Sequence, residues 1–195
     1  TLQQTNEELT RNIGKREKAE AETRQRNREL TLLNKVIAAT VTSQEPETVL
    51  ETACRELVHA FKLTQAVAVL ANEDISSVRV VADYHPTIQY SILGQTFLVE
   101  GNPLLEYLAT HKEPLAVEDA QSDSRTASIR TILQMRNTVS LLLCALIVDE
   151  EIVGGISLAS DKPRQFAADE LALILSVTEQ VSGALARIRL AEERQ

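Results

Sequence analysis

The sequence predicts an α+β domain in which long helices lead into and out of a core that contains paired strands. Short runs rich in β-formers occur in pairs separated by acidic turns, which is typical of antiparallel hairpins. Runs with an apolar residue at every third or fourth position precede, separate and follow these pairs, which indicates core-facing helices. The 195 residues, 44% of them hydrophobic, suffice for one domain and an extra element.

Composition excludes several classes of function. The net charge is −8 and aromatic residues make up 3% of the chain, which argues against nucleic-acid binding because phosphates need a basic face. Two distant cysteines give neither a disulfide framework nor a zinc ribbon, and we expect a cytoplasmic protein. The longest apolar run, LLLCALIV, is too short to span a bilayer, so we expect no direct membrane contact. Because the chain starts at Thr1 and its one methionine is Met135, we expect a segment of a longer protein.

Residues 1–30 differ in composition from the rest of the chain. They hold seven Lys or Arg and six Asp or Glu, whereas the remainder carries a charge of −9. Steps of three and four residues define a heptad seam with a polar middle, which includes Arg16 and Arg26. We predict one long helix whose seam packs on the same helix of a second chain, and the alternative is a solvated single helix. The apolar seam residues are Leu2, Leu9, Leu30, Leu33 and Ile37.

The first half of the domain has clear local signals. Pro46 suits the first position of a helix, which then presents an apolar residue at every fourth position as far as Phe61. Residues 65–72 and 77–84 form a predicted hairpin, and His85-Pro86 ends its second strand. A short strand over residues 93–99, a helix after Pro103 and a short strand from Leu115 follow.

The second half contains the most apolar strand. Ser122 or Asp123 could cap a helix that carries Ile129 and Met135. Residues 139–148 are apolar on both faces, which predicts a central strand covered on both sides. After an acidic turn, residues 152–160 complete a second hairpin, in which Gly154 and Gly155 allow a close backbone approach. The last helix, from Asp169, repeats a heptad pattern, so we predict a second dimer seam with Leu171, Ile174, Val181, Leu185 and Ile188.

This order of elements resembles the GAF domain family of sensory and regulatory modules. The residues that carry the resemblance are Pro46-Glu47-Thr48-Val49-Leu50, the stretch from His111 to Val117, the loop residues Asp119, Asp123 and Arg125, and the stretch from Cys144 to Glu170 with Arg164 and Phe166. The resemblance implies an antiparallel sheet with helices on one face and a small-molecule pocket, or its closed remnant, on the other. The composition shift after residue 30 and the extent of the resemblance together predict three parts: a coiled-coil-like signalling helix over residues 1–30, a GAF-like domain over 31–190 and the start of an exit linker helix over 191–195.

In bacteria such domains commonly sit on helical linkers in dimeric histidine kinases and diguanylate cyclases. The resemblance therefore implies a sensor that binds a small molecule and relays its state through a homodimer. The alternative is a ligand-free structural domain for dimerisation and relay. We expect the pocket wall on the sheet face opposite the long helices, with residues 86–136 as its roof. The predicted lining residues are Arg125, Arg130, Ser140 and Leu142.

The identity of a cofactor is not predicted. A covalent bilin is disfavoured because the chain has no Cys-His pair, and Cys54 and Cys144 fit as small core residues. A cyclic nucleotide remains the weaker candidate: Asp161-Lys162, Phe166 and Asp169-Glu170 are similar to the family's binding signature, with altered identity and spacing. The competing interpretation is an ion pair between Lys162 and Asp169, with Phe166 packed at the helix start. Haem is disfavoured, and His111 would be its first candidate ligand.

The residues offer no support for catalysis or a metal site. The three histidines are scattered without an i, i+4 partner, and no Gly-rich phosphate loop or Gly-x-Ser-x-Gly motif occurs. The acidic pairs lie in a turn and at a helix end, where they are solvated charges. We therefore predict a regulatory or sensory segment and not an enzyme.

Overall fold

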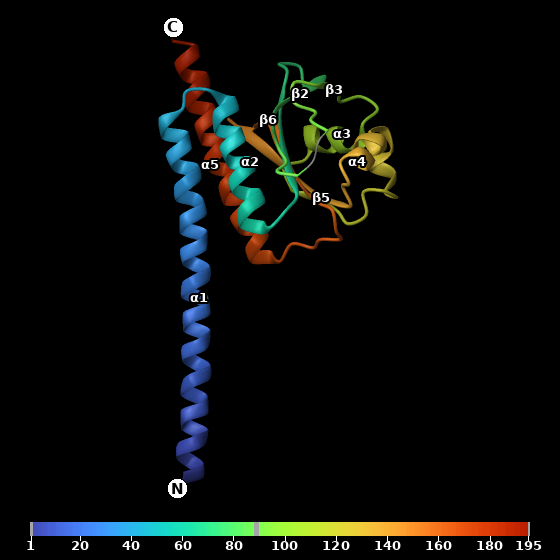
Figure 1. Ribbon diagram of the computed structural model, residues 1–195. Coiled ribbons are helices and arrows are strands. Elements are labelled where there is room, and N and C mark those ends of the chain that lie inside the picture. The colour runs from blue at the N-terminus through green and yellow to red at the C-terminus, as the bar shows by residue number, and fades with distance from the viewer. Residues whose placement is uncertain (1, 88–89, 195) are drawn as a thin grey trace.

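An antiparallel sheet lies between two layers of helices (Figure 1). The computed structural model describes residues 2–87 and 90–194, so position 1 of the predicted signalling helix, positions 88 and 89 of the predicted roof and position 195 of the predicted linker lie outside the described residues. Within the described chain the sheet has six strands in the order β3-β2-β1-β6-β5-β4, and all neighbours are antiparallel. The predicted α+β fold is confirmed. The strands are β1 (Gln65–Ala71), β2 (Ser77–Tyr84), β3 (Thr96–Leu98), β4 (Leu115–Val117), β5 (Ser140–Val148) and β6 (Glu151–Ser160).

Three long helices cover one face of the sheet. They are α1 (Leu2–Thr42), α2 (Pro46–Phe61) and α5 (Ala168–Glu192). Helices α1 and α5 run in the same direction and α2 runs in the opposite direction, so the free end of α1 and the last turn of α5 lie at opposite ends of the molecule (Figure 1). Pro46 is the first residue of α2, as its fixed φ predicts.

Short helical segments cover the opposite face. They are α3 (Pro103–Thr110), the 3₁₀ helix η1 (Ser124–Ile129) and α4 (Arg130–Met135). The Asn102 side chain caps α3 by accepting from the backbone N–H of Leu105, and Asp123 caps η1 by accepting from the N–H of Arg125. These caps fix where each short helix begins.

Strand β5 is buried on both faces, as its sequence predicts. Leu142 and Cys144 belong to the core under the long helices, whereas Leu141 and Leu143 belong to the smaller core under α3 and α4. In the neighbouring strand, a Cβ on Gly154 would collide with the backbone oxygen of Val69. This confirms the predicted close approach, because only glycine lets β1 and β6 pair at this position.

The predicted seam on α5 is wrong for four of its five residues. Ile174, Val181, Leu185 and Ile188 are buried in the core of their own chain, and Leu171 is half-buried against it. These side chains pack under the sheet and cannot contact a partner chain. The helix is long and apolar enough to cross a membrane by length and composition alone, but a core helix passes the same test.

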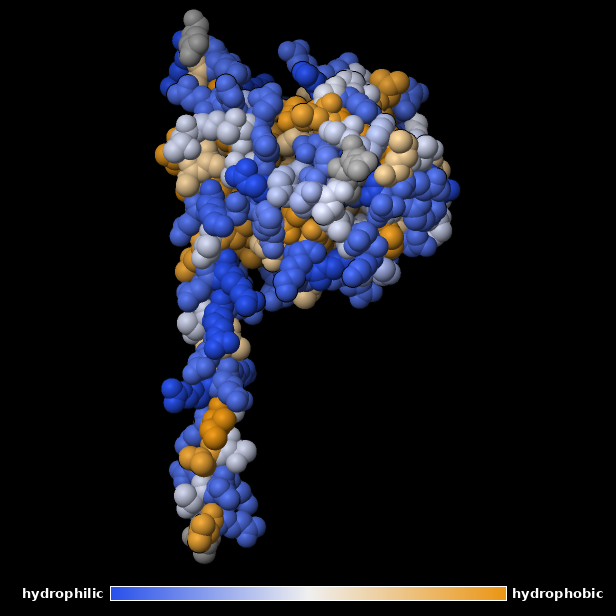
Figure 2. Space-filling view, viewed as in Figure 1, coloured by the Kyte–Doolittle hydropathy of each residue, from blue (hydrophilic) through white to orange (hydrophobic). Residues whose placement is uncertain are grey.

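Helix α1 extends far beyond the domain (Figure 1). Leu32 and Val36 anchor its last turns in the core, and Leu33 is half-buried there. The other predicted seam residues, Leu2, Leu9, Leu30 and Ile37, are exposed in the single chain. Figure 2 shows orange patches near the free end of α1 and a blue stretch between them and the domain, which matches the polar middle of the seam.

Candidate functional site

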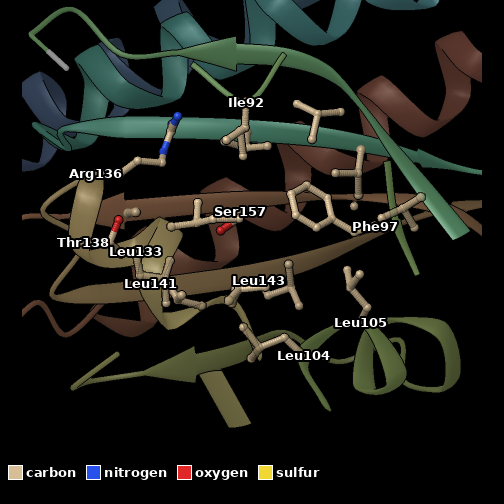
Figure 3. A pocket seen from close by; sticks show the side chains of 18 of the residues that line it. Ile92, Phe97, Leu104, Leu105, Leu133, Arg136, Thr138, Leu141, Leu143 and Ser157 are labelled. Carbon is tan, nitrogen blue, oxygen red and sulfur yellow. The ribbon is translucent and has the colours of Figure 1, made fainter. Parts of the chain in front are cut away.

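A mostly apolar cavity of about 120 Å³ lies between the sheet and the short helices. Its floor comes from β1, β2, β5 and β6, and its roof from segment 92–105 and from residues 129–136 (Figure 3). The cavity therefore lies on the sheet face opposite the long helices, as predicted, and its roof falls within the predicted residues 86–136. The lining residues are Gln65, Val67, Val69, Val78, Val80, Ile92, Phe97, Asn102, Leu104, Leu105, Ile129, Ile132, Leu133, Arg136, Thr138, Leu141, Leu143, Gly155, Ser157 and Ala159.

Few polar side chains reach this cavity. Ser157 lies on β6 in the middle of the floor, where it is half-buried, and its hydroxyl has no hydrogen-bond partner among the described residues. Thr138 lies at one end, where its Oγ1 accepts from Gln65 Nε2 at 2.7 Å. Figure 3 shows the Ser157 oxygen between Phe97 and the end that holds Thr138 and Arg136. The cavity thus combines an apolar wall with one free hydroxyl at its centre.

A buried ion pair closes the polar end of the cavity. Arg136, the C-cap of α4, donates from Nη2 to Asp83 Oδ1 at 2.7 Å and from Nη1 to Asp83 Oδ2 at 3.0 Å. The side chains are 3% and 0% exposed. Arg136 Nε also donates to Gln65 Oε1 at 2.7 Å, so the guanidinium is held by β1 and by β2. This bidentate geometry fixes α4 to the floor of the cavity.

The same pair fastens a second part of the roof. Arg136 Nη1 donates to the carbonyl oxygen of Tyr90 at 2.7 Å, and Asp83 Oδ2 accepts from Ser91 Oγ at 3.0 Å and from the N–H of Ile92 at 2.8 Å. Sequence reasoning missed Asp83 and Arg136. Their separation of 53 positions leaves no local pattern, and strict alternation places Asp83 on the strand face opposite to Val78 and Val80, which line the cavity. The register shift between β1 and β2, which skips Val81, changes this phase.

The predicted lining residues Ser140 and Leu142 do not face this cavity. Ser140 Oγ donates to the carbonyl oxygen of Lys162 at 2.7 Å, and Leu142 packs under the long helices. Because strand side chains alternate, Leu141 and Leu143 point into the cavity instead. The predicted strand and region were right and the predicted face was wrong.

The predicted lining residues Arg125 and Arg130 also lie outside the cavity wall. Arg125 pairs with Asp123 through its Nε and Nη2 atoms at 2.9 and 2.6 Å. These hydrogen bonds lower the pKa of Asp123 to about 2. Arg130 Nη2 donates to the carbonyl oxygen of Asp123 at 2.7 Å, so both arginines brace the loop before η1.

Both cysteines are small core residues, as predicted. Cys54 and Cys144 are 0% and 1% exposed and lie in the core under the long helices. Burial raises the pKa of the Cys54 thiol, and it raises the pKa of Cys144 to about 12. Neither thiol faces the cavity. His111 is exposed at the end of α3, where its ring stacks on Tyr107 with centroids 4.1 Å apart.

The ion pair predicted before α5 has different partners. Arg164 Nη2 pairs with Glu170 Oε1 at 2.7 Å, and its guanidinium carbon lies 4.9 Å from the centroid of the Phe166 ring. Asp169 Oδ2 instead accepts from Gln25 Nε2 on α1 at 2.6 Å. Lys162 is exposed. Glu170, and not Asp169, is thus the acidic residue of the ion pair at the start of α5. Its Oε2 also accepts from the N–H of Ala167 at 3.0 Å, which caps the helix.

The described residues contain no group of three or more His, Cys, Asp or Glu side chains that could hold a metal ion. The cavity itself offers amide, hydroxyl and guanidinium groups but no carboxylate or imidazole in its lining. Such a lining suits binding of a small organic molecule.

The sequence pattern of the GAF domain matches residues 45–187. This chain belongs to the GAF domain family. Comparison with curated protein sequences gives no significant match. The GAF family consists of sensory and regulatory modules, so this segment is a sensory or regulatory GAF domain.

Solved structures of other proteins share the fold at low sequence identity. The phycoerythrobilin-bound GAF domain of a cyanobacterial phytochrome is 18% identical, with a TM-score of 0.71, over 84% of this chain and 97% of that chain. The GAF domain of a phosphoenolpyruvate-protein phosphotransferase from Coxiella burnetii is 14% identical, with a TM-score of 0.73, over 85% and 96%. Residues 122 to 287 of a methyl-accepting chemotaxis protein are 16% identical, with a TM-score of 0.68, over 80% and 98%.

Proposed function

We propose that this GAF domain binds a small molecule in the cavity and relays occupancy to its long helices. The observation that carries the proposal is that β5 and β6 lie between the cavity and the long helices. Leu143 faces the cavity, and the next residue, Cys144, packs in the core that also contains Ile174 of α5. Because packed cores shift as units, a ligand that displaces β5 also displaces α5.

The long helices suit transmission along the molecule. Helices α1 and α5 pack against each other, run in the same direction and leave the domain at opposite ends (Figure 1). Gln25 of α1 donates to Asp169 of α5 at 2.6 Å where the two helices meet. In the proposed full-length protein, a cytoplasmic histidine kinase or diguanylate cyclase, α1 carries the input and α5 the output.

We propose that the relay works in a homodimer. The exposed residues Leu2, Leu9, Leu30 and Ile37 have no core of their own chain to enter, and an isolated polar helix is only marginally stable. On α5 the residues available to a second copy differ from the predicted seam. Glu179 and Leu190 are exposed on this helix, and Gly183 between them is half-buried.

Native mass spectrometry of the whole chain tests both parts of this proposal. We expect a dimer with excess mass over the denatured chain, from one small molecule per subunit. A monomer at micromolar concentration contradicts the homodimer. A dimer without excess mass, even after titration with candidate ligands, supports the second candidate, a ligand-free relay. The small cavity and its roof closed by Asp83 and Arg136 favour this second candidate.

Replacement of the polar seam positions tests the homodimer separately. Arg16→Leu combined with Arg26→Leu places apolar side chains at two polar positions of the seam. We expect the dissociation constant of the dimer, measured by sedimentation, to fall by at least about tenfold. Arg11→Leu adds one leucine outside the seam and should leave the dimer unchanged. Equal effects of the seam and control variants would contradict this account of α1.

A further inference from the structure

The hydroxyl of Ser157 is one of two polar side-chain groups of the cavity lining without a hydrogen-bond partner among the described residues, and the other is Nδ2 of Asn102. Ser157 lies on β6 in the apolar floor. Neighbouring floor positions carry Val67, Leu143 and Ala159, which offer no polar atom from their side chains. Ser157 is half-buried and its strand neighbours Val67 and Leu143 are apolar, so a bound molecule that hydrogen-bonds to this hydroxyl takes the place of water there.

The arginine at the end of the cavity does not make this an anion site. Both nitrogens at the tip of the guanidinium of Arg136 already donate to the Asp83 carboxylate, and its Nε donates to Gln65. The charge of Arg136 is therefore neutralised within the protein. A ligand carboxylate would either lie beside the buried Asp83 carboxylate or displace it, and both arrangements leave a buried charge without compensation.

The size of the cavity limits the ligand further. An apolar cavity of about 150 Å³ accommodates benzene, with about six non-hydrogen atoms. The cavity here is about 120 Å³. A nucleotide or a tetrapyrrole exceeds this volume several-fold, because pockets for drug-sized ligands start at about 300 Å³.

We propose that the cavity selects an uncharged, mostly apolar molecule of about six non-hydrogen atoms whose one polar group hydrogen-bonds to Ser157 Oγ. This inference rests on the proposed function and adds the chemical class of its ligand. Ser157 determines specificity, and the Asp83–Arg136 pair excludes anions.

Three probes of about six non-hydrogen atoms test the proposal: cyclopentanone, methylcyclopentane and butyrate. Cyclopentanone is neutral and has a hydrogen-bond acceptor, methylcyclopentane is neutral without an acceptor, and butyrate is an anion. Binding to the whole chain is measured through the methyl NMR signals of Val67 and Leu143, which line the cavity. We expect cyclopentanone and methylcyclopentane to bind and butyrate not to bind.

The variant Ser157→Ala isolates the hydroxyl. It should weaken cyclopentanone about fivefold, since a net hydrogen bond contributes about 1 kcal/mol, and should leave methylcyclopentane within about twofold of its original affinity. Ser176→Ala on α5, far from the cavity lining, is the control and should change neither. Equal effects of Ser157→Ala on both neutral probes, or preferential binding of butyrate, would overturn the proposal. Failure of all three probes would overturn this inference, whereas the proposed function is decided separately by the excess mass in native mass spectrometry.

Discussion

Replacing Asp83 with asparagine should destabilise the domain more than any other single change of a charged residue discussed here. The variant keeps the shape of the side chain but removes its charge, and the guanidinium of Arg136 stays buried without a counter-ion. The two side chains are 0% and 3% exposed, so water cannot compensate. Breaking a buried pair by removing one partner costs about 3–5 kcal/mol. The amide nitrogen also introduces a donor where Arg136, Ser91 and Ile92 all donate.

Urea denaturation followed by circular dichroism measures this loss. With a slope of about 2 kcal/mol/M, the midpoint should fall by about 1.5–2.5 M. Glu20→Gln breaks the exposed Arg16–Glu20 pair and is the control, which should cost less than about 1 kcal/mol. A loss below about 1 kcal/mol for Asp83→Asn would refute the claim that the pair is buried and closes the cavity.

A double variant separates charge from packing at the same site. Asp83→Leu combined with Arg136→Met removes both charges and leaves neither uncompensated. The double variant should therefore lose less stability than Asp83→Asn alone, because replacing a buried pair with apolar residues is often neutral. A double variant less stable than the single one would show that the hydrogen bonds to Tyr90 and Gln65 matter more than the ion pair.

Three further outcomes follow from burial, backbone space and charge. Both cysteines should resist thiol reagents at pH 8 until the chain unfolds, because burial raises the pKa of Cys144 to about 12 and the reactive thiolate is scarce; labelling in the folded state would contradict this. Gly154→Ala should cost several kcal/mol in denaturation experiments because its Cβ meets backbone, whereas Gly183→Ala in α5 should be stabilising by up to about 1 kcal/mol. The lowered pKa of Asp123, about 2 against an ordinary 3.8, stabilises the fold above pH 4, and this contribution is lost as the pH falls towards 2. In the variant Asp123→Asn, the free energy of unfolding should therefore change less with pH between 4 and 2 than in the original chain.

The element order could be predicted because its signals are local. Pro46 sets the start of α2, the alternation in Ser77–Tyr84 gives β2 its bounds, and the double-sided apolar run gives β5 its central place. Each signal lies within a few residues of the element that it predicts. The two hairpins followed, since both turns are short and acidic.

The face of each strand and helix could not be predicted in the same way. A strand apolar on both sides carries no phase information, so Ser140 and Leu142 were predicted to face the cavity when Leu141 and Leu143 do. The pairing of Asp83 with Arg136 depends on how α4 folds back over the sheet, which no spacing in the sequence encodes. Arg125 and Arg130 were predicted to line the pocket because an arginine was expected there. They instead donate to the carboxylate and carbonyl oxygens of Asp123, in the loop before η1.

The last helix shows why a heptad pattern has two meanings. A stripe of apolar residues at steps of three and four buries itself equally well against a partner helix or against a sheet. The apolar stripe of α5 packs against the sheet, where Ile174, Val181 and Leu185 lie under β5 and beside α1. The inner face of α5 therefore follows the sheet, and only its outer face is available to the second copy in the proposed homodimer. Under that proposal, a movement of β5 over the cavity would reach the dimer surface through this single helix.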